Sequence, residues 1–216
     1  MIHLKNKGLT LVFAVLFIIT LAGQIVSGLK EYNKDMADKG GQPLSLAGYV
    51  TSGHFLSSTF ENWESEFLQM ALYVVLPIFL YQKGSSESKD PDAMEDVDKD
   101  PDQQRVNAPW AVKKGGWILG VYKHSLSIVL LIFFVLSFLL HWHGSMKGYN
   151  EEQSLKNLPS VTAGQYLGNS RFWFESFQNW QSEFLSIVVM VVLTVYLRQV
   201  GSPMSKPLDT PYGERS

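Results

Sequence analysis

The chain has 216 residues, with 18 basic and 20 acidic side chains, a formal net charge of −2 and no cysteine. The near-neutral balance gives no reason to expect a nucleic acid partner, and the lack of cysteine excludes disulfides, a thiol nucleophile and a cysteine metal site. Long uncharged apolar segments alternate with charged ones. Such segments are typical of transmembrane helices, which cross about 30 Å of hydrocarbon at about 1.5 Å per residue.

The first uncharged segment, residues 8–29, follows Lys5 and Lys7. A cleavable signal peptide has the same arrangement. However, residues 9–29 align with residues 126–146, which are internal and cannot be a signal. The alignment therefore favours a retained first membrane span over residues 8–29.

Polar segments follow the first span of each half. Ser45 and its counterpart Thr162 are predicted to cap short helices, because a hydroxyl at that position accepts a hydrogen bond from the helix's free N–H groups. Ser58 and Glu61 have the spacing of a capping box, which predicts the start of the next helix at residue 58.

Aromatic residues crowd these outer segments. A flat ring with a polar atom is favoured where membrane meets water. We therefore predict that Tyr49, Trp63, Tyr166 and Trp180 are interfacial anchors, on segments that lie along the outer membrane surface.

A nine-residue motif occurs twice, as FENWESEFL at residues 60–68 and as FQNWQSEFL at residues 177–185. The apolar runs after it are too short to cross a membrane alone, so each span must begin within the motif. This predicts spans over residues 58–82 and 176–199, with a kink at Pro77 in the first.

Residues 90–117 separate the halves. Their acidic, proline-containing part cannot bury enough apolar surface to order itself and predicts a solvated cytoplasmic linker. Its spaced acids lack the central glycine and closing glutamate of a calcium loop. Residues 110–117, with a tryptophan at each end, are predicted to anchor at the interface. Residues 207–216 are predicted to be a disordered tail.

Basic residues set the predicted orientation, because short loops rich in Lys and Arg stay in the cytoplasm. The two outer segments hold 6 of the 18 basic residues, and the remaining segments hold 12. This predicts four spans, including a third at residues 124–146, with both termini cytoplasmic. Repeat one (1–89) and repeat two (118–206), offset by 117 positions, then insert in the same direction. The predicted fold is an all-α integral membrane four-helix bundle built from two tandem parallel two-span repeats.

Three features repeat across the halves: the nine-residue motif, a Tyr-Asn pair after the first span (Tyr32-Asn33 and Tyr149-Asn150), and a closing Gln-x-Gly-Ser (residues 82–85 and 199–202). With these features the chain resembles a family of small bacterial membrane proteins with no assigned function. The resemblance covers nearly the whole chain and implies a bacterial inner-membrane location, without implying an activity.

Polar residues within the motif recur at helical spacing, three and four positions apart, so that each copy forms one polar stripe. A carboxylate on a spanning helix should face protein or water, because exposing it to lipid is costly. The stripe is a candidate site for a cation or proton, or else a structural feature in which the carboxylates satisfy amides or favour the amino ends of their own helices. The candidate residues are Asn62, Ser65 and Glu66 with Asn179, Ser182 and Glu183.

Two further residues are predicted at the depth of the motif carboxylates. Gln24 would pair with Glu66, and His141, its counterpart 117 positions later, with Glu183, since a buried carboxylate needs a hydrogen-bond donor. The alternative is that Gln24 and His141 face interfacial water. His141 and His143 point to different sides of a helix, so no metal site is predicted.

Neither a catalytic motif nor a cofactor-binding motif occurs in the sequence, so no enzyme activity or cofactor is expected. The predicted function is a non-enzymatic structural or interaction protein of the envelope. The alternative is a small cation- or proton-translocating protein that uses the duplicated polar stripe. Expected partners are the lipid bilayer and a second copy of the chain or another envelope protein.

Overall fold

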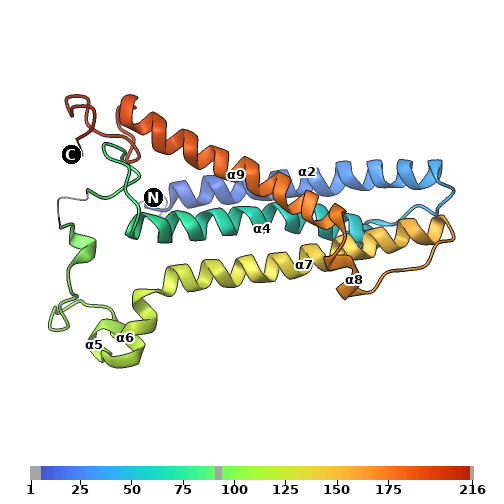
Figure 1. Ribbon diagram of the computed structural model, residues 1–216, viewed down its shortest axis with the longest axis horizontal. Helices are drawn as coiled ribbons and strands as arrows, with labels where there is room; N and C mark the ends of the chain where they lie inside the picture. The colour runs from blue at the N-terminus through green and yellow to red at the C-terminus, as the bar shows by residue number, and fades with distance from the viewer. Residues whose placement is uncertain (1–5, 91–93, 215–216) are drawn as a thin grey trace. The chain divides into compact units, whose positions relative to one another are not determined.

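The computed structural model describes residues 6–90 and 94–214, in which helices are joined by irregular segments and no strand occurs (Figure 1). The elements in chain order are α2 (Gly8–Asp38), α3 (Leu46–Tyr49), α4 (Gly53–Val75), the 3-10 turns η1 (Leu76–Ile78) and η2 (Asp96–Asp98), α5 (Trp110–Lys114), α6 (Gly116–Lys123), α7 (Ser125–Leu155), α8 (Ala163–Leu167) and α9 (Ser170–Tyr196). The all-α prediction is confirmed. The helices contribute to two compact units: unit 1 takes residues 1–60 and 139–172, and unit 2 takes 61–138 and 173–216.

Among the described residues, three helices are long and apolar enough to cross a membrane: α2, α7 and α9. The sequence predicted a fourth such helix, and α4 is not among the three. Glu61, Glu64 and Glu66 lie in its middle part, and it ends at Val75 instead of continuing to residue 82. Its apolar part is therefore shorter than expected.

Pro77 explains where α4 ends. A proline within a helix cannot donate the backbone hydrogen bond, and its ring clashes with the carbonyl four residues earlier. The α-helix stops at Val75 and a 3-10 turn carries the proline. The prediction of a kinked continuous helix is wrong on this point. Thr194 occupies the matching position in α9, which continues to Tyr196.

The first helix of each half runs further than predicted, to Asp38 instead of residue 29 and to Leu155 instead of residue 146. Each ends two residues before a residue with left-handed backbone, Gly40 (φ 74°) after α2 and Asn157 (φ 56°) after α7. These two residues are 117 positions apart. Such a residue lets the following N–H groups bond back to the last helical carbonyls.

The predicted caps of the short helices are confirmed. The Ser45 hydroxyl accepts a hydrogen bond from the N–H of Gly48, and Thr162 with Gln165 forms a capping box. The predicted Ser58–Glu61 cap is wrong. The helix α4 already begins at Gly53, and the Ser58 hydroxyl lies inside it and donates to the carbonyl of Phe55.

Close glycine contacts hold helices together in unit 1. A Cβ at Gly53 would lie 2.2 Å from the backbone nitrogen of Gly148, and one at Gly144 would lie 2.6 Å from that of Ser57. The start of α4 therefore packs directly on the backbone of α7. Gly23, on α2, has no atom within 4 Å of such a Cβ, so no close neighbour meets it in the described structure.

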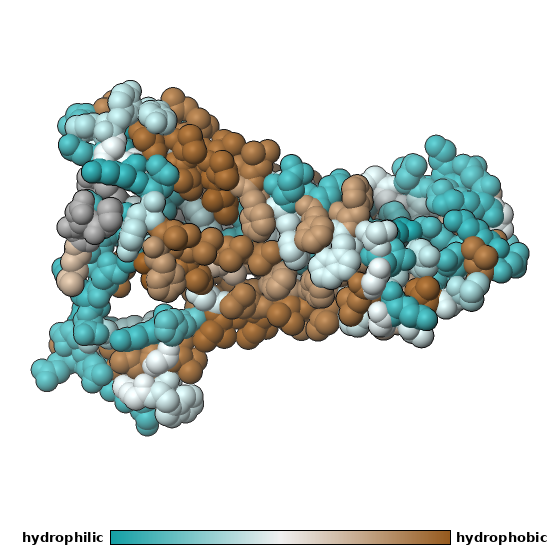
Figure 2. Space-filling model, in the orientation of Figure 1, coloured by the Kyte–Doolittle hydropathy of each residue, from teal (hydrophilic) through white to brown (hydrophobic). Residues whose placement is uncertain are grey.

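Unit 2 packs the remaining parts of α4, α7 and α9 with the linker and tail. Figure 2 shows apolar side chains over α9 and α7, with polar side chains over the tail and linker. The tail was predicted to be disordered, but its described part contacts α9. Arg198 donates to the carbonyl of Thr210 at 3.2 Å, and the rings of Tyr196 and Tyr212 lie 5.9 Å apart.

Candidate functional site

Two asparagines in unit 1 fasten the connecting segments to the long helices. The Asn33 amide donates to the carbonyl of Leu44 at 3.0 Å and accepts from its N–H at 2.7 Å. Asn150 makes the same two bonds with Val161, at 3.0 and 2.8 Å. Each side chain therefore satisfies both backbone groups of one residue, and the two clamps are 117 positions apart.

Two of the predicted anchors, Tyr49 and Tyr166, lie in the interior of unit 1, with 1 % and 0 % of their surface exposed. Each packs on the tyrosine that precedes a clamp, with ring centroids 5.8 Å apart for Tyr32 and Tyr49 and 5.4 Å for Tyr149 and Tyr166. The half-wetted surroundings expected of an interfacial anchor are absent at both rings. Proteins often bury tyrosine when its hydroxyl has a partner, and sequence alone did not reveal the partners.

Those partners are polar side chains of unit 1. The Tyr166 hydroxyl lies 2.6 Å from Oγ of Ser145. The Tyr49 hydroxyl lies 3.2 Å from Nδ1 of His54. Partial burial lowers the pKa of His54, helped by the positive charge of Arg171 and opposed by two nearby carboxylates, Asp35 and Glu151.

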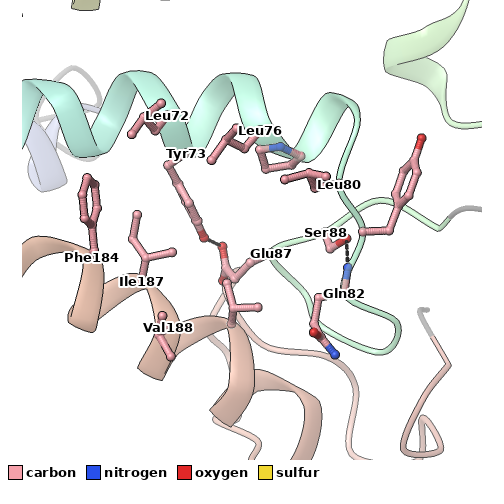
Figure 3. A pocket seen from close by; sticks show the side chains of 13 residues that line it. Leu72, Tyr73, Leu76, Leu80, Gln82, Glu87, Ser88, Phe184, Ile187 and Val188 are labelled. Carbon is pink, nitrogen blue, oxygen red and sulfur yellow. Dashed lines mark hydrogen bonds between the residues drawn. The ribbon is translucent and has the colours of Figure 1, made fainter.

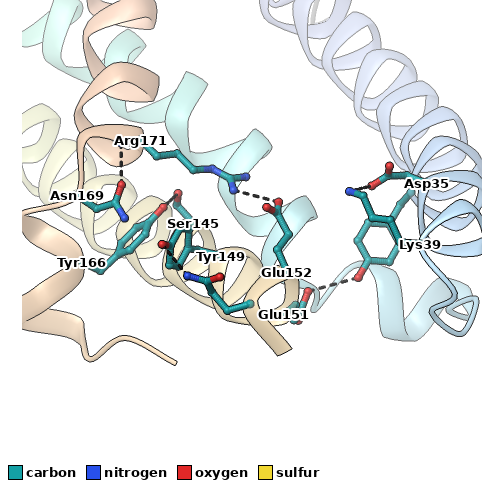
Figure 4. Close-up of polar contacts among 11 residues, drawn as sticks. Asp35, Lys39, Ser145, Tyr149, Glu151, Glu152, Tyr166, Asn169 and Arg171 are labelled. Atoms are coloured by element: carbon teal, nitrogen blue, oxygen red, sulfur yellow. Dashed lines mark hydrogen bonds and ion pairs between the residues drawn. The ribbon is translucent and has the colours of Figure 1, made fainter. Parts of the chain in front are cut away.

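The rim of unit 1 carries ion pairs and hydrogen bonds between charged side chains (Figure 4). Arg171 pairs with Glu152 at 3.0 Å, and Lys39 with Asp35 at 2.6 Å. The Tyr32 hydroxyl donates to Glu151 at 3.3 Å. These groups are used in structural contacts, and the partly exposed pairs contribute little stability each.

Gln24 and His141 both belong to unit 1, whereas their predicted partners Glu66 and Glu183 belong to unit 2. The Gln24 amide donates to the hydroxyl of Thr59 at 3.1 Å. His141 is completely buried, and its ring centroid lies 4.9 Å from that of Phe172 in unit 1. The pairing with the glutamates stays a prediction.

Unit 2 contains a buried carboxylate that the sequence analysis overlooked. Glu64 has no exposed surface, and the indole N–H of Trp180 donates to its Oε1 at 2.8 Å. Trp180, predicted as an interfacial anchor, thus has a polar role across two helices, whereas Trp63 is half-buried on α4. The second motif copy has Gln181 at the position of Glu64 and leaves it exposed. This difference between the two motif copies is the sequence feature that could have singled out Glu64.

The two polar stripes meet in unit 2. The Gln69 amide donates to the hydroxyl of Ser186 at 2.6 Å and to the carbonyl of Glu183 at 2.8 Å. Gln69 and Ser186, which continue the two stripes one residue past each copy of the motif, are themselves 117 positions apart. The stripe serines, Ser65 and Ser182, donate to carbonyls of their own helices, those of Asn62 and Asn179.

The stripe carboxylates have no such partner. Glu66 is exposed and Glu183 is half-buried. Within the described part of the chain, neither carboxylate has a hydrogen bond or ion pair, and the two lie close enough to repel each other. Two uncompensated carboxylates on α4 and α9 could hold a cation or take up a proton.

A model of one protein family, described as a domain of unknown function, DUF6766, matches residues 2–216. The chain belongs to the DUF6766 family. The resemblance to an uncharacterised family is thereby confirmed. Neither the curated proteins nor the solved structures include a significant match to this member of DUF6766.

Proposed function

We propose that this DUF6766 protein is a four-span protein of the bacterial inner membrane that acts as a non-enzymatic structural or interaction protein of the envelope. Both termini would lie in the cytoplasm, and the outer segments at residues 30–59 and 147–176 would lie at the opposite face. The three apolar helices support the membrane location. In this arrangement α4 would complete the fourth crossing, with its carboxylates turned away from lipid.

The proposal includes two tandem repeats, because equivalent contacts recur at an offset of 117 positions. The asparagine clamps and the tyrosine pairs are two examples. A third closes each half: the Ser88 hydroxyl accepts from the N–H of Gln82 at 2.8 Å, and Ser205 accepts from Gln199 at 2.8 Å. The meeting of Gln69 with Ser186 supports a two-fold relation between α4 and α9.

The observation that carries the structural role is the pair of clamps at Asn33 and Asn150. Connecting segments that lacked such bonds could move to open a path or to cover a ligand. Here both segments are tied to the adjacent long helix through two hydrogen bonds each. A surface held in this way suits recognition of another envelope component more than it suits a moving gate.

The exposed apolar surface of the first helix favours contact with lipid or with another chain. In its most apolar 18-residue stretch, α2 has no buried residue. In a bilayer that surface would contact acyl chains, a second copy of the protein, or an envelope protein partner. A homo-oligomer is part of the proposal because α2 offers the least-covered apolar helix.

A second candidate function is cation or proton translocation, favoured by the uncompensated Glu66 and Glu183. Reconstitution into liposomes separates the two functions. The structural role predicts that wild-type protein leaves Na⁺, K⁺ and proton fluxes at the level of empty liposomes. Flux that appears with wild-type protein and disappears in the Glu66→Gln, Glu183→Gln double variant would overturn the structural role and establish translocation. A Glu152→Gln variant, altered at the rim of unit 1, is the matched control.

A further inference from the structure

Unit 2 contains an apolar cavity of about 420 Å³ (Figure 3). It is lined from α4 by residues such as Leu72 and Leu76 and from α9 by residues such as Ile187 and Val188. The segment after η1 forms the remaining wall. A cavity of this size falls within the range of small-molecule sites in proteins.

One carboxylate stands in the apolar wall. Glu87 is half-buried and lines the cavity, and the Tyr73 hydroxyl, also on the wall, donates to its Oε2 (Figure 3). The Ser86 hydroxyl donates to Oε1 at 3.3 Å. Glu87 forms no ion pair with any residue in the described ranges. A charged group beside apolar side chains is costly unless a cation compensates it.

The carboxylate is fixed in place by its own loop. The N–H of Glu87 donates to the hydroxyl of Ser85 at 3.1 Å, and that hydroxyl lies 2.8 Å from Oγ1 of Thr194 on α9. Ser85 is completely buried. The hydrogen bond between Ser85 and Thr194 therefore attaches the loop to α9 and holds Glu87 at the cavity wall. The carboxylate is in this way preorganised for a ligand.

The second half of the chain offers an internal comparison. The positions 117 residues after Tyr73 and Glu87 are Met190 and Met204, which line a smaller cavity of about 200 Å³. No acidic residue lines that cavity. The corresponding segment of the second half folds with Met204 in place of Glu87, so the fold of this segment does not require a carboxylate there.

We propose that the cavity binds a molecule with a primary ammonium group on an apolar chain. The ammonium would donate charge-assisted hydrogen bonds to Glu87 and contact the Tyr73 hydroxyl oxygen, while the chain lies among the leucines of α4 and the aliphatic side chains of α9. A primary ammonium occurs in free alkylamines, which carry it directly on the apolar chain, and in the phosphatidylethanolamine headgroup, where a phosphodiester joins it to the acyl chains. The proposal rests on unit 2 alone and holds for either function discussed above.

Binding is measured by isothermal titration calorimetry on the full chain in dodecyl maltoside, with three probes that share one tail. Octylammonium is expected to bind at least about tenfold more tightly than 1-octanol, with octyltrimethylammonium between them because it lacks N–H donors. Equal binding of octylammonium and octanol by the wild-type protein, or binding of neither, overturns the proposal. This comparison needs no variant.

Variants then locate the ammonium. Glu87→Gln is expected to remove the preference for octylammonium over octanol, and Tyr73→Phe to reduce it. Asp209→Asn, an exposed change of equal charge in the tail, is expected to leave the preference unchanged. A preference that survives in a folded Glu87→Gln variant, or that Asp209→Asn lowers equally, overturns the assignment.

Native mass spectrometry distinguishes the two sources of the ammonium. The protein is purified from membranes that contain phosphatidylethanolamine and phosphatidylglycerol. Phosphatidylethanolamine retained by wild-type protein and lost in Glu87→Gln identifies the lipid headgroup as the source. Glu87-dependent binding of octylammonium without retained phosphatidylethanolamine identifies a free amine.

Discussion

Removing one asparagine clamp tests how unit 1 is held together. Asn33→Ala deletes two hydrogen bonds to Leu44 and leaves both backbone groups of that half-buried residue without a protein partner. Since a typical hydrogen bond contributes about 0.5–1.5 kcal/mol net, we expect Asn33→Ala to lower the free energy of unfolding by about 1–3 kcal/mol. Asn150→Ala should have an effect of the same size, because its two bonds to Val161 have nearly the same lengths.

The measurement is unfolding in mixed micelles of dodecyl maltoside and sodium dodecyl sulfate, followed by circular dichroism. Asn33→Asp distinguishes the two bonds, because a carboxylate still accepts from the N–H of Leu44 but cannot donate to its carbonyl. The exposed linker residue Asn107, changed to alanine, is the matched control and should stay within about 0.5 kcal/mol of wild type. A loss below about 0.5 kcal/mol in both clamp variants would refute the reasoning.

Three further predictions concern side chains whose roles the structure defines. Trp180→Phe should lower the free energy of unfolding by about 1–3 kcal/mol, because Glu64 loses the indole donor. In a double-mutant cycle, Trp180→Phe should have a smaller effect when Glu64 is already alanine. Effects that simply add would contradict the contact. Gly53→Ala should destabilise the protein strongly because the new Cβ meets the backbone of α7, whereas Gly23→Ala, with open space around it, should be neutral or slightly stabilising; the measurement is the thermal midpoint of each variant. The pKa of His54 is lowered in the folded protein, so protonation of His54 favours the unfolded state. The free energy of unfolding should therefore fall as pH drops from about 7.5 through the unfolded pKa of about 6.5. His54→Gln should flatten this pH dependence, and an unchanged profile would contradict the assignment.

Features that depend on local residue chemistry could be predicted from the sequence. The all-α class follows from composition and periodicity, and the caps at Ser45 and Thr162 follow from a hydroxyl followed by a helix-forming stretch. The ends of the long helices were missed. Charged residues after the apolar segments were read as loop, although a helix can continue through them until a left-handed residue such as Gly40 ends it.

Features that depend on contacts between distant segments could not be predicted. Tyr49 and Tyr166 were assigned to a membrane interface because they lie near apolar segments, but their hydroxyls find partners in unit 1. The role of Glu64 depends on Trp180, 116 positions away. The same limit applies to Glu87, which in sequence is one acid among many in a charged stretch and in the structure stands in the wall of an apolar cavity.

The central claim, two repeats inserted in the same direction with the linker in the cytoplasm, is tested most directly by cysteine labelling. The chain has no cysteine of its own, so single cysteines at Asp38, Asn157 and Asp98, all exposed, report without background. In intact spheroplasts, a membrane-impermeant maleimide should label the cysteines at positions 38 and 157, and should label the one at position 98 only after lysis. Labelling of position 98 from outside, or opposite accessibility of positions 38 and 157, would contradict the account.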